Sequence, residues 1–206
     1  MKNENETKKR IRESALKLFE EKSFEEVTVI DICKASGITK HTFYYYFKSK
    51  DDLLEKFYKI PCALSMEEVG AILTTDSYVE QVWMINKKFI DFVKTQGVEI
   101  LKQIMIKNLM TDQGTFRPNT NEIKELLKLQ NSIIEKGKAS GQFESRINSR
   151  DLTKMFQQLL HSTLFIWVTS DGDFDFEEFV RYEFEILFQV ESKYRKIKES
   201  PIKYIW

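Results

Sequence analysis

The chain has 206 residues, with 32 basic and 32 acidic side chains and therefore no net charge when its two histidines are neutral. This length and a hydrophobic content of 42% suit one large domain, or a small domain beside a larger one, with a substantial core. The neutral charge balance excludes a general basic field that would draw the whole protein to nucleic acid, so any such binding must come from a local surface.

Glycine and proline are scarce, at 7 and 3 residues, which favours long helices with few turns. No apolar run approaches the roughly 18 residues of a membrane span, and no signal peptide opens the chain. We therefore expect a soluble, cytoplasmic protein. Cys33 and Cys62 lack the spacing of metal ligands and are expected to be small buried residues in a reducing compartment.

The first predicted helix covers about residues 7–22. Its apolar stripe follows the i, i+4, i+7, i+8 pattern through Ile11, Ala15, Leu18 and Phe19. A basic cluster at its start is either an arm for phosphates or the minor groove, or only a solvated face. The cluster consists of Lys8, Lys9, Arg10 and Arg12.

Two short helices follow, separated by a tight turn. Thr28 can cap a helix over residues 29–36, and Gly37 can adopt the positive φ that closes the turn after it. Thr39 can then cap the next helix, which extends to about Lys50. This order predicts a helix-turn-helix whose second helix reads DNA.

The predicted reader helix has two different faces. At about 100° per residue, Phe43 and Phe47 fall on one side, while His41 and Tyr45 fall on the other. A helix that only packs has no reason to carry Tyr and His on its outer face, whereas a helix that enters a DNA groove does. Lysines near the reader would meet phosphates: Lys34, Lys40, Lys48 and Lys50.

We expect His41 and Tyr45 to touch base edges and Lys40 to reach bases or phosphates. Hydroxyls and an ammonium group nearby are expected to bind phosphate, from Thr28, Thr42, Tyr44 and Lys50. The full set of predicted DNA-binding residues is Thr28, Thr39, Lys40, His41, Thr42, Tyr44, Tyr45, Tyr46 and Lys50.

These segments resemble the DNA-binding domain of TetR-family transcriptional regulators. The resemblance is gapless over about residues 10–54 and rests on four segments: residues 16–19, 24–27, 28–37 and 39–53. It implies a helix-turn-helix head on a larger helical body that dimerises and binds a ligand. Ile30 stands where many relatives carry a polar or basic residue, and His41 where a small residue or proline is common; both bear on the operator sequence.

The rest of the chain predicts an all-α body, giving about nine helices in total. A helix from about Asp51 should break near Pro61, because proline removes a helical hydrogen bond. Further helices are expected at about 76–97, 98–110, 121–139, 149–170 and 175–198, with a loop at 112–120. We divide the chain into a helix-turn-helix domain, residues 1–50, and a ligand-binding and dimerisation domain, residues 51–206.

The last two predicted helices carry wide apolar faces that one layer of neighbouring helices cannot cover. A second copy of the chain would cover them in a four-helix interface about a two-fold axis, as the resemblance also implies. We expect the homodimer interface to centre on Leu164, Trp167, Val180 and Leu187. The two reader helices would then lie about 34–36 Å apart or somewhat further, on a roughly palindromic operator.

Bulky side chains in the body are numerous enough to surround an apolar pocket, although each taken singly also fits a core. The predicted ligand-binding residues are Trp83, Phe89, Phe92, Met105, Phe116, His161 and Phe165. His161 is either a core or interface histidine or a polar group that faces a ligand. The expected effector is a small apolar or aromatic molecule of unknown identity.

Catalysis, cofactors and metals find no support in the sequence. The two histidines are far apart, and no nucleophile pair, glycine-rich phosphate loop or metal signature is present. Residues 171–175 hint at a calcium loop, but the glycine is misplaced and Tyr182 stands where the final glutamate belongs. Three hypotheses remain: a dimeric repressor released by a small molecule, a DNA-binding regulator controlled by a protein partner, and a helical enzyme or carrier, which the reader helix disfavours.

Overall fold

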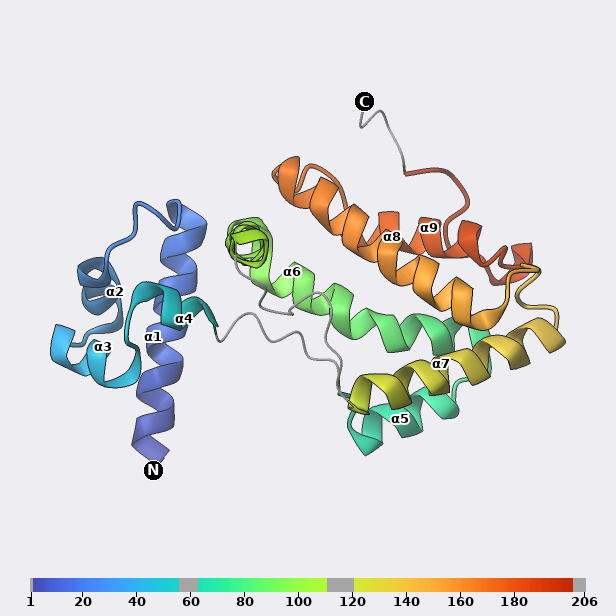
Figure 1. Ribbon diagram of the computed structural model, residues 1–206, viewed down its shortest axis with the longest axis horizontal. Helices are drawn as coiled ribbons and strands as arrows, with labels where there is room; N and C mark the ends of the chain where they lie inside the picture. The colour runs from blue at the N-terminus through green and yellow to red at the C-terminus, as the bar shows by residue number, and fades with distance from the viewer. Residues whose placement is uncertain (1, 56–62, 111–120, 202–206) are drawn as a thin grey trace. The chain divides into compact units, whose positions relative to one another are not determined.

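The computed structural model describes residues 2–55, 63–110 and 121–201. These residues form nine α-helices and one short 3-10 helix, with no strand beyond a single bridging pair, so the all-α prediction is confirmed (Figure 1). None of the described helices combines the length and apolar character needed to cross a membrane. The contacts divide the described chain into two compact units.

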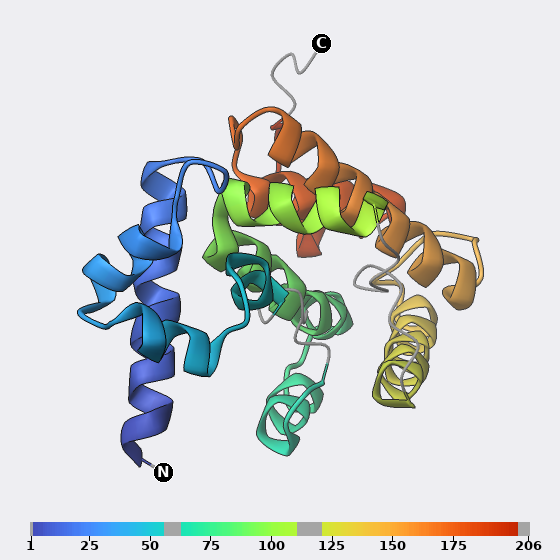
Figure 2. The same cartoon turned by 60° about the vertical axis from the view of Figure 1, so that its left-hand side comes forward.

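The first unit contains four helices and part of a fifth. Helix α1 (Lys2–Glu21) runs beside α2 (Val29–Ser36), followed by α3 (Lys40–Tyr46) and α4 (Lys50–Glu55) (Figure 2). The apolar stripe predicted for the first helix forms its core, with Ile11 and Phe19 fully buried. Unlike the predicted division after residue 50, the contacts group α4 and residues 95–110 with this unit.

Polar contacts attach the second half of α6 to this unit. The Glu99 carboxylate accepts a hydrogen bond from the backbone N–H of Phe24 at 3.1 Å. Gln103 donates to the carboxylate of Glu25 at 3.2 Å. Lys107 also lies 3.9 Å from Asp51 at the start of α4. These residues therefore hold the loop after α1 and the start of α4 together.

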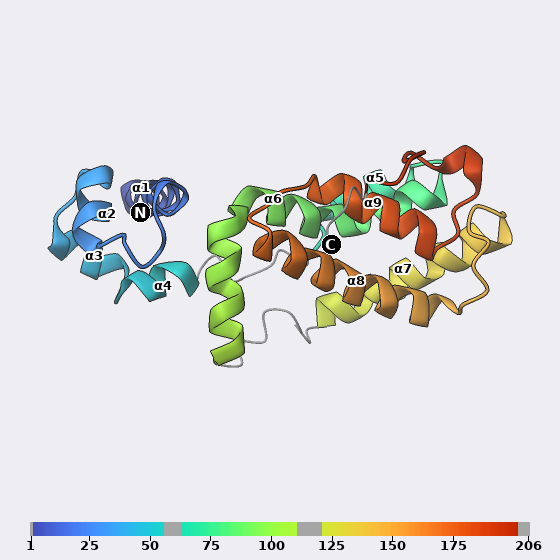
Figure 3. The same ribbon diagram turned by 90° about the horizontal axis from the view of Figure 1, so that it is seen from above.

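The second unit consists of α5 (Met66–Leu73), the first part of α6 (Tyr78–Met110), α7 (Asn121–Ala139), α8 (Ser149–Thr169) and α9 (Phe176–Leu187), followed by a 3-10 turn (Ser192–Tyr194). Helices α8 and α9 pack side by side (Figure 3). The core contains a cluster of phenylalanine rings: Phe184 lies 5.2 Å from Phe156 and 4.6 Å from Phe188, centroid to centroid.

The helices differ from the sequence prediction at two places and agree with it at Gly97. Residues 66–73 form a helix that the sequence prediction lacks, begun by a capping box between Ser65 and Glu68. The predicted break at Gly97 is confirmed, since its φ of 74° and ψ of 169° interrupt α6. The last helix ends at Leu187 rather than near residue 198, because the chain turns at Gln189 (φ 50°) and Val190 pairs with Phe143. The predicted interruption at Pro61 and the predicted loop at residues 112–120 lie outside the described residues.

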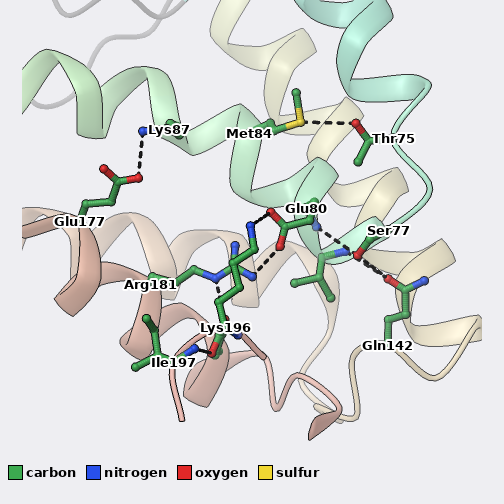
Figure 4. A network of polar contacts seen from close by, with 12 residues as sticks. Thr75, Ser77, Glu80, Met84, Lys87, Gln142, Glu177, Arg181, Lys196 and Ile197 are labelled. Carbon is green, nitrogen blue, oxygen red and sulfur yellow. Dashed lines mark hydrogen bonds and ion pairs between the residues drawn. The ribbon is translucent and has the colours of Figure 1, made fainter. Parts of the chain in front are cut away.

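A buried ion-pair network ties the segment after α9 to the body (Figure 4). Arg181 is 3% exposed and donates to Glu185 at 2.6 Å and to Glu80 at 2.7 Å. The carboxylate of Glu185, 1% exposed, also accepts the backbone N–H groups of Lys196 at 2.8 Å and Ile197 at 3.2 Å. The charges of Arg181 and Glu185 therefore compensate each other. Removing one partner would leave the other as a buried charge with less compensation.

Replacing Gly97 by alanine should destabilise the protein. A φ of 74° is strained for any residue with a Cβ, so we expect the free energy of unfolding to fall by about 1–3 kcal/mol. Gly70 is the matched control, because it is exposed in the interior of α5 and a Cβ there meets nothing within 4 Å. Denaturant titration should find Gly70→Ala neutral or slightly stabilising; equal effects of the two substitutions would contradict the assigned backbone strain.

Candidate nucleic-acid interface

Local side-chain chemistry fixes α2 and the turn after it. Thr28 accepts the backbone N–H of Asp31 at 3.3 Å, while Asp31 accepts that of Thr28 at 2.9 Å, a complete capping box. The Thr28 hydroxyl also donates to the Asp31 carboxylate at 2.6 Å, and this bond, followed by the bond from the Thr28 backbone, lowers the pKa of the Asp31 carboxyl. Gly37 ends the helix in the left-handed conformation (φ 64°, ψ 39°), and Ile38 donates to the carbonyl of Cys33 at 3.0 Å.

Helix α3 is held by its cap and by two buried rings. Thr39 accepts the backbone N–H of Thr42 at 3.1 Å. Phe43 and Phe47 are 0% and 1% exposed, with their ring centroids 5.7 Å apart. The face that the sequence predicted to pack is therefore the buried one, and the opposite face is presented rigidly to solvent.

The outward face of α3 is aromatic, hydroxylated and basic. Tyr45 is 67% exposed and Tyr44 is 55% exposed, although aromatic side chains of this size are usually buried. Lys40 and His41 are also exposed, one turn earlier. Thr42 and Tyr46 are half-buried beside them, and the Thr42 hydroxyl lies 2.9 Å from that of Thr39. The fold thus brings most of the predicted DNA-binding residues onto one small surface.

Lys50 is a correction to the predicted set. Its ammonium group donates to the carbonyl of Phe24 and, at 2.8 Å, to that of Val27, and it lies 4.1 Å above the Phe24 ring. Partial burial lowers the pKa of this ammonium group. The side chain is directed into its own domain, where it closes the loop after α1, and is not free to meet a phosphate.

Two of the predicted ligand-binding residues lie elsewhere than expected. Trp83 is 5% exposed and packs in the core, 5.7 Å from the ring of Phe184. Phe165 is 55% exposed on the outside of α8. Phe116 lies outside the described residues. The two side chains thus differ in burial, because an apolar pattern does not say which of two neighbours a side chain faces.

The other predicted ligand-binding residues are half-buried. Phe89 meets the imidazole of His161 edge to face at 5.9 Å, and burial lowers the pKa of His161. Phe92 also belongs to the second unit, whereas Met105 belongs to the part of α6 grouped with the first. Sequence reasoning missed the buried polar residues of the body, above all Gln130, although its place on the apolar stripe of α7 could have been seen in the sequence.

The residues predicted for the dimer interface differ in how deeply they are buried within one chain. Val180 and Leu164 are 0% and 1% exposed within one chain, so they belong to its own core and the prediction that they centre a dimer interface is wrong. Trp167 and Leu187 are half-buried. The large apolar side chains that α8 and α9 do expose are Met155, Phe165 and Ile186.

Across the described ranges, no three His, Cys, Asp or Glu side chains are grouped to hold a metal ion.

A capped helix-turn-helix that exposes Tyr, His and Lys on a larger helical body defines a class: DNA-binding transcriptional regulators of the helix-turn-helix type. Residues 11–57 match the family described as "Bacterial regulatory proteins, tetR family", and residues 66–190 match "YsiA-like protein, C-terminal region". The second match covers more than half of the chain. The chain belongs to the TetR family of transcriptional regulators.

Individual relatives agree with this assignment. The chain is 23% identical over 168 residues to the "Fatty acid metabolism regulator protein" of Bacillus subtilis (strain 168), which covers 80% of this chain and 85% of the relative. Its fold is similar to that of the fatty acid degradation regulator FadR from Bacillus halodurans, with a TM-score of 0.55, 20% identity, and coverage of 88% of this chain and 94% of that one. The TetR-family regulator PfmR from Thermus thermophilus gives a TM-score of 0.51 at 18% identity, over 88% and 98% of the two chains.

Two of the lysines predicted to bind DNA should respond differently to replacement. Lys40→Ala should weaken operator binding and lower the dependence of log K on log salt by about one, because one phosphate contact is lost. Lys50→Met should leave that slope unchanged and instead lower the free energy of unfolding by about 1–2 kcal/mol, because two carbonyls lose their donor. Fluorescence anisotropy over a salt series and thermal denaturation measure the two effects. A lower salt slope for Lys50→Met would restore Lys50 to the phosphate contacts.

Proposed function

We propose that this protein is a homodimeric repressor that binds a roughly palindromic operator through α3 and is released from it by a small, largely apolar effector. The observation that carries the DNA-binding part is the exposed surface of Tyr44, Tyr45, His41 and Lys40 on a helix locked from behind by Phe43. Tyr45 and His41 are assigned to base edges, and Lys40 and Tyr44 to the DNA backbone.

The dimer is assigned to the exposed apolar side chains of α8 and α9. Phe165 is 55% exposed, Ile186 48% and Met155 42%. Apolar groups of this size on two adjacent helices mark an interaction surface, and an isologous contact would bury them against the same surface of a second copy. Two helices from each subunit then form the four-helix interface.

One pair of substitutions tests this assignment. Phe165→Asp should give a folded monomer, because a charge would have to be buried at the interface while the subunit itself loses little packing. Val180→Asp should instead unfold the chain, because Val180 is fully buried within one subunit. Analytical ultracentrifugation and circular dichroism separate the two results. A wild-type monomer at micromolar concentration, or a dimeric Phe165→Asp variant, would refute this interface.

The effector is assigned to the body, where Phe89 and His161 meet in a half-buried position between α6 and α8. The B. subtilis relative is named for fatty acid metabolism, which supports a fatty-acyl compound as the first class to test. Release from the operator needs a difference of only about 1–3 kcal/mol in effector affinity between two states. The influence would pass through α4, which follows the reader helix closely, and through α6, which contributes residues to both units.

A direct screen tests the effector. Fatty acids, their coenzyme A thioesters and neutral aromatic compounds should be compared for their effect on the thermal midpoint and for release of labelled operator DNA. A compound at 100 times its dissociation constant should stabilise the protein by about 2.7 kcal/mol. If no compound of these classes does either, the ligand-gated version fails, and a regulator controlled by a protein partner remains.

A further inference from the structure

The two tyrosines that α3 exposes most each lie against a neighbouring ring. Tyr44 meets Phe43 edge to face, with ring centroids 5.5 Å apart and an interplanar angle of 90°. Tyr45 meets Tyr46 in the same way, at 4.9 Å and 87°. Tyr44 and Tyr45 are 55% and 67% exposed, whereas Phe43 is 0% exposed and Tyr46 is half-buried. In both pairs, a ring that faces solvent is therefore supported by a ring that is more deeply buried.

Tyr46 occupies the flank of α3, between its buried and exposed faces. At about 100° per residue, it falls on the same side of the helix as Phe43, and Tyr45 falls next to it on the outer side. Phe43 and Phe47 are buried behind it and fix the helix to its domain. Tyr46 thus stands between the packed side of the helix and the tyrosine that is assigned to base edges.

An exposed tyrosine needs support if it is to read a base pair. Ordering a mobile side chain on binding has an entropic cost, which is smaller when the free protein already holds that side chain in its bound rotamer. An edge-to-face contact between rings is favourable beyond the apolar area that it buries, so it favours the rotamers that make it. The contact with Tyr46 therefore limits the directions in which the Tyr45 ring and its hydroxyl can point.

We propose that Tyr46 is a positioning residue for operator recognition: it does not touch the DNA, and it holds the Tyr45 ring in the orientation that reads a base edge. This role differs from the sequence prediction, which placed Tyr46 among the residues that bind DNA. The inference rests on the proposed function, in which Tyr45 contacts bases, and adds the residue that aligns this contact. Specificity at one base pair then depends on a second ring that lies behind the contact surface.

A double-mutant cycle on the full-length protein tests the proposal with two DNA probes. One probe is a duplex that the wild-type protein selects from a random-sequence pool, and the other is an unselected duplex of the same length. Tyr46→Leu should weaken binding to the selected duplex about three- to tenfold, because Tyr45 loses its ring contact, and should leave binding to the unselected duplex unchanged. In a Tyr45→Ala background, Tyr46→Leu should have no further effect.

Three companion variants separate this role from a direct contact and from a general loss of structure. Tyr46→Phe keeps the ring and loses the hydroxyl, so this conservative variant should retain the preference for the selected duplex. Tyr46→Leu should keep its full effect in a Lys40→Ala background, because the contact assigned to Lys40 does not depend on Tyr45. Tyr194→Leu, which removes a half-buried tyrosine ring from the second unit, is the matched control and should bind both duplexes as wild type does.

The outcomes separate this inference from the proposed function. Equal effects of Tyr46→Leu with and without the Tyr45 ring would overturn the positioning role, as would an equal loss of affinity for both duplexes. A Tyr46→Phe variant that is as weak as Tyr46→Leu would also overturn it, since the hydroxyl would then bind the DNA. All three results would leave the DNA-binding function intact, whereas a wild-type protein that selects no sequence from the pool would overturn both.

A measurement on the wild type decides the matter should Tyr46→Leu fail to fold. Nuclear magnetic resonance of the tyrosine-labelled protein reports contacts between the rings of Tyr45 and Tyr46 and the mobility of each ring. An ordered Tyr45 ring in contact with Tyr46 in the free protein supports the positioning role. A freely mobile Tyr45 ring without that contact overturns it.

Discussion

Gly97 allows one helix to serve two compact units. Before it, α6 buries Val82, Ile90 and Val93 in the body; after it, α6 buries Ile100 and Ile104 in the unit that carries the helix-turn-helix. Packing anchors both halves of α6, and the helical backbone is interrupted between them, at Gly97. A residue without Cβ adopts the required φ of 74° at little cost.

The helix-turn-helix could be predicted from the sequence almost residue by residue, because local chemistry determines it. Thr28, Gly37 and Thr39 act within three or four positions of themselves, through caps and a left-handed turn. The division of α3 into a buried and an exposed face follows from helical periodicity alone. The start of α5 is equally local, since Ser65 and Glu68 form a capping box three residues apart, and this signal in the sequence was sufficient to predict it.

The body was less predictable because its helices have more than one apolar side. A wheel shows that Val180 and Phe165 are apolar, but not that the first faces its own core and the second faces outward. Lys50 illustrates the same limit for charge: the carbonyls that bind it are more than twenty residues away in sequence. The end of α9 depends on the pairing of Val190 with Phe143, which is likewise a long-range contact. Each error concerns a partner that only the folded chain supplies.

Two of the most buried polar side chains of the body, Glu185 and Gln130, differ in how they are satisfied. Glu185 has a full set of partners, from Arg181 and from the chain after α9, whereas the Gln130 donor has none among the described residues. Full pairing is typical of a group that fixes one conformation.

The bond between Glu185 and the backbone of residues 196 and 197 also sets an order of events during synthesis. Protein domains begin to fold while the ribosome is still extending them. Here the carboxylate that must be buried in α9 is completed by amide groups made ten or so residues later. The phenylalanine core can gather earlier, but the Glu185 carboxylate does not have all of its partners until Ile197 has left the ribosome.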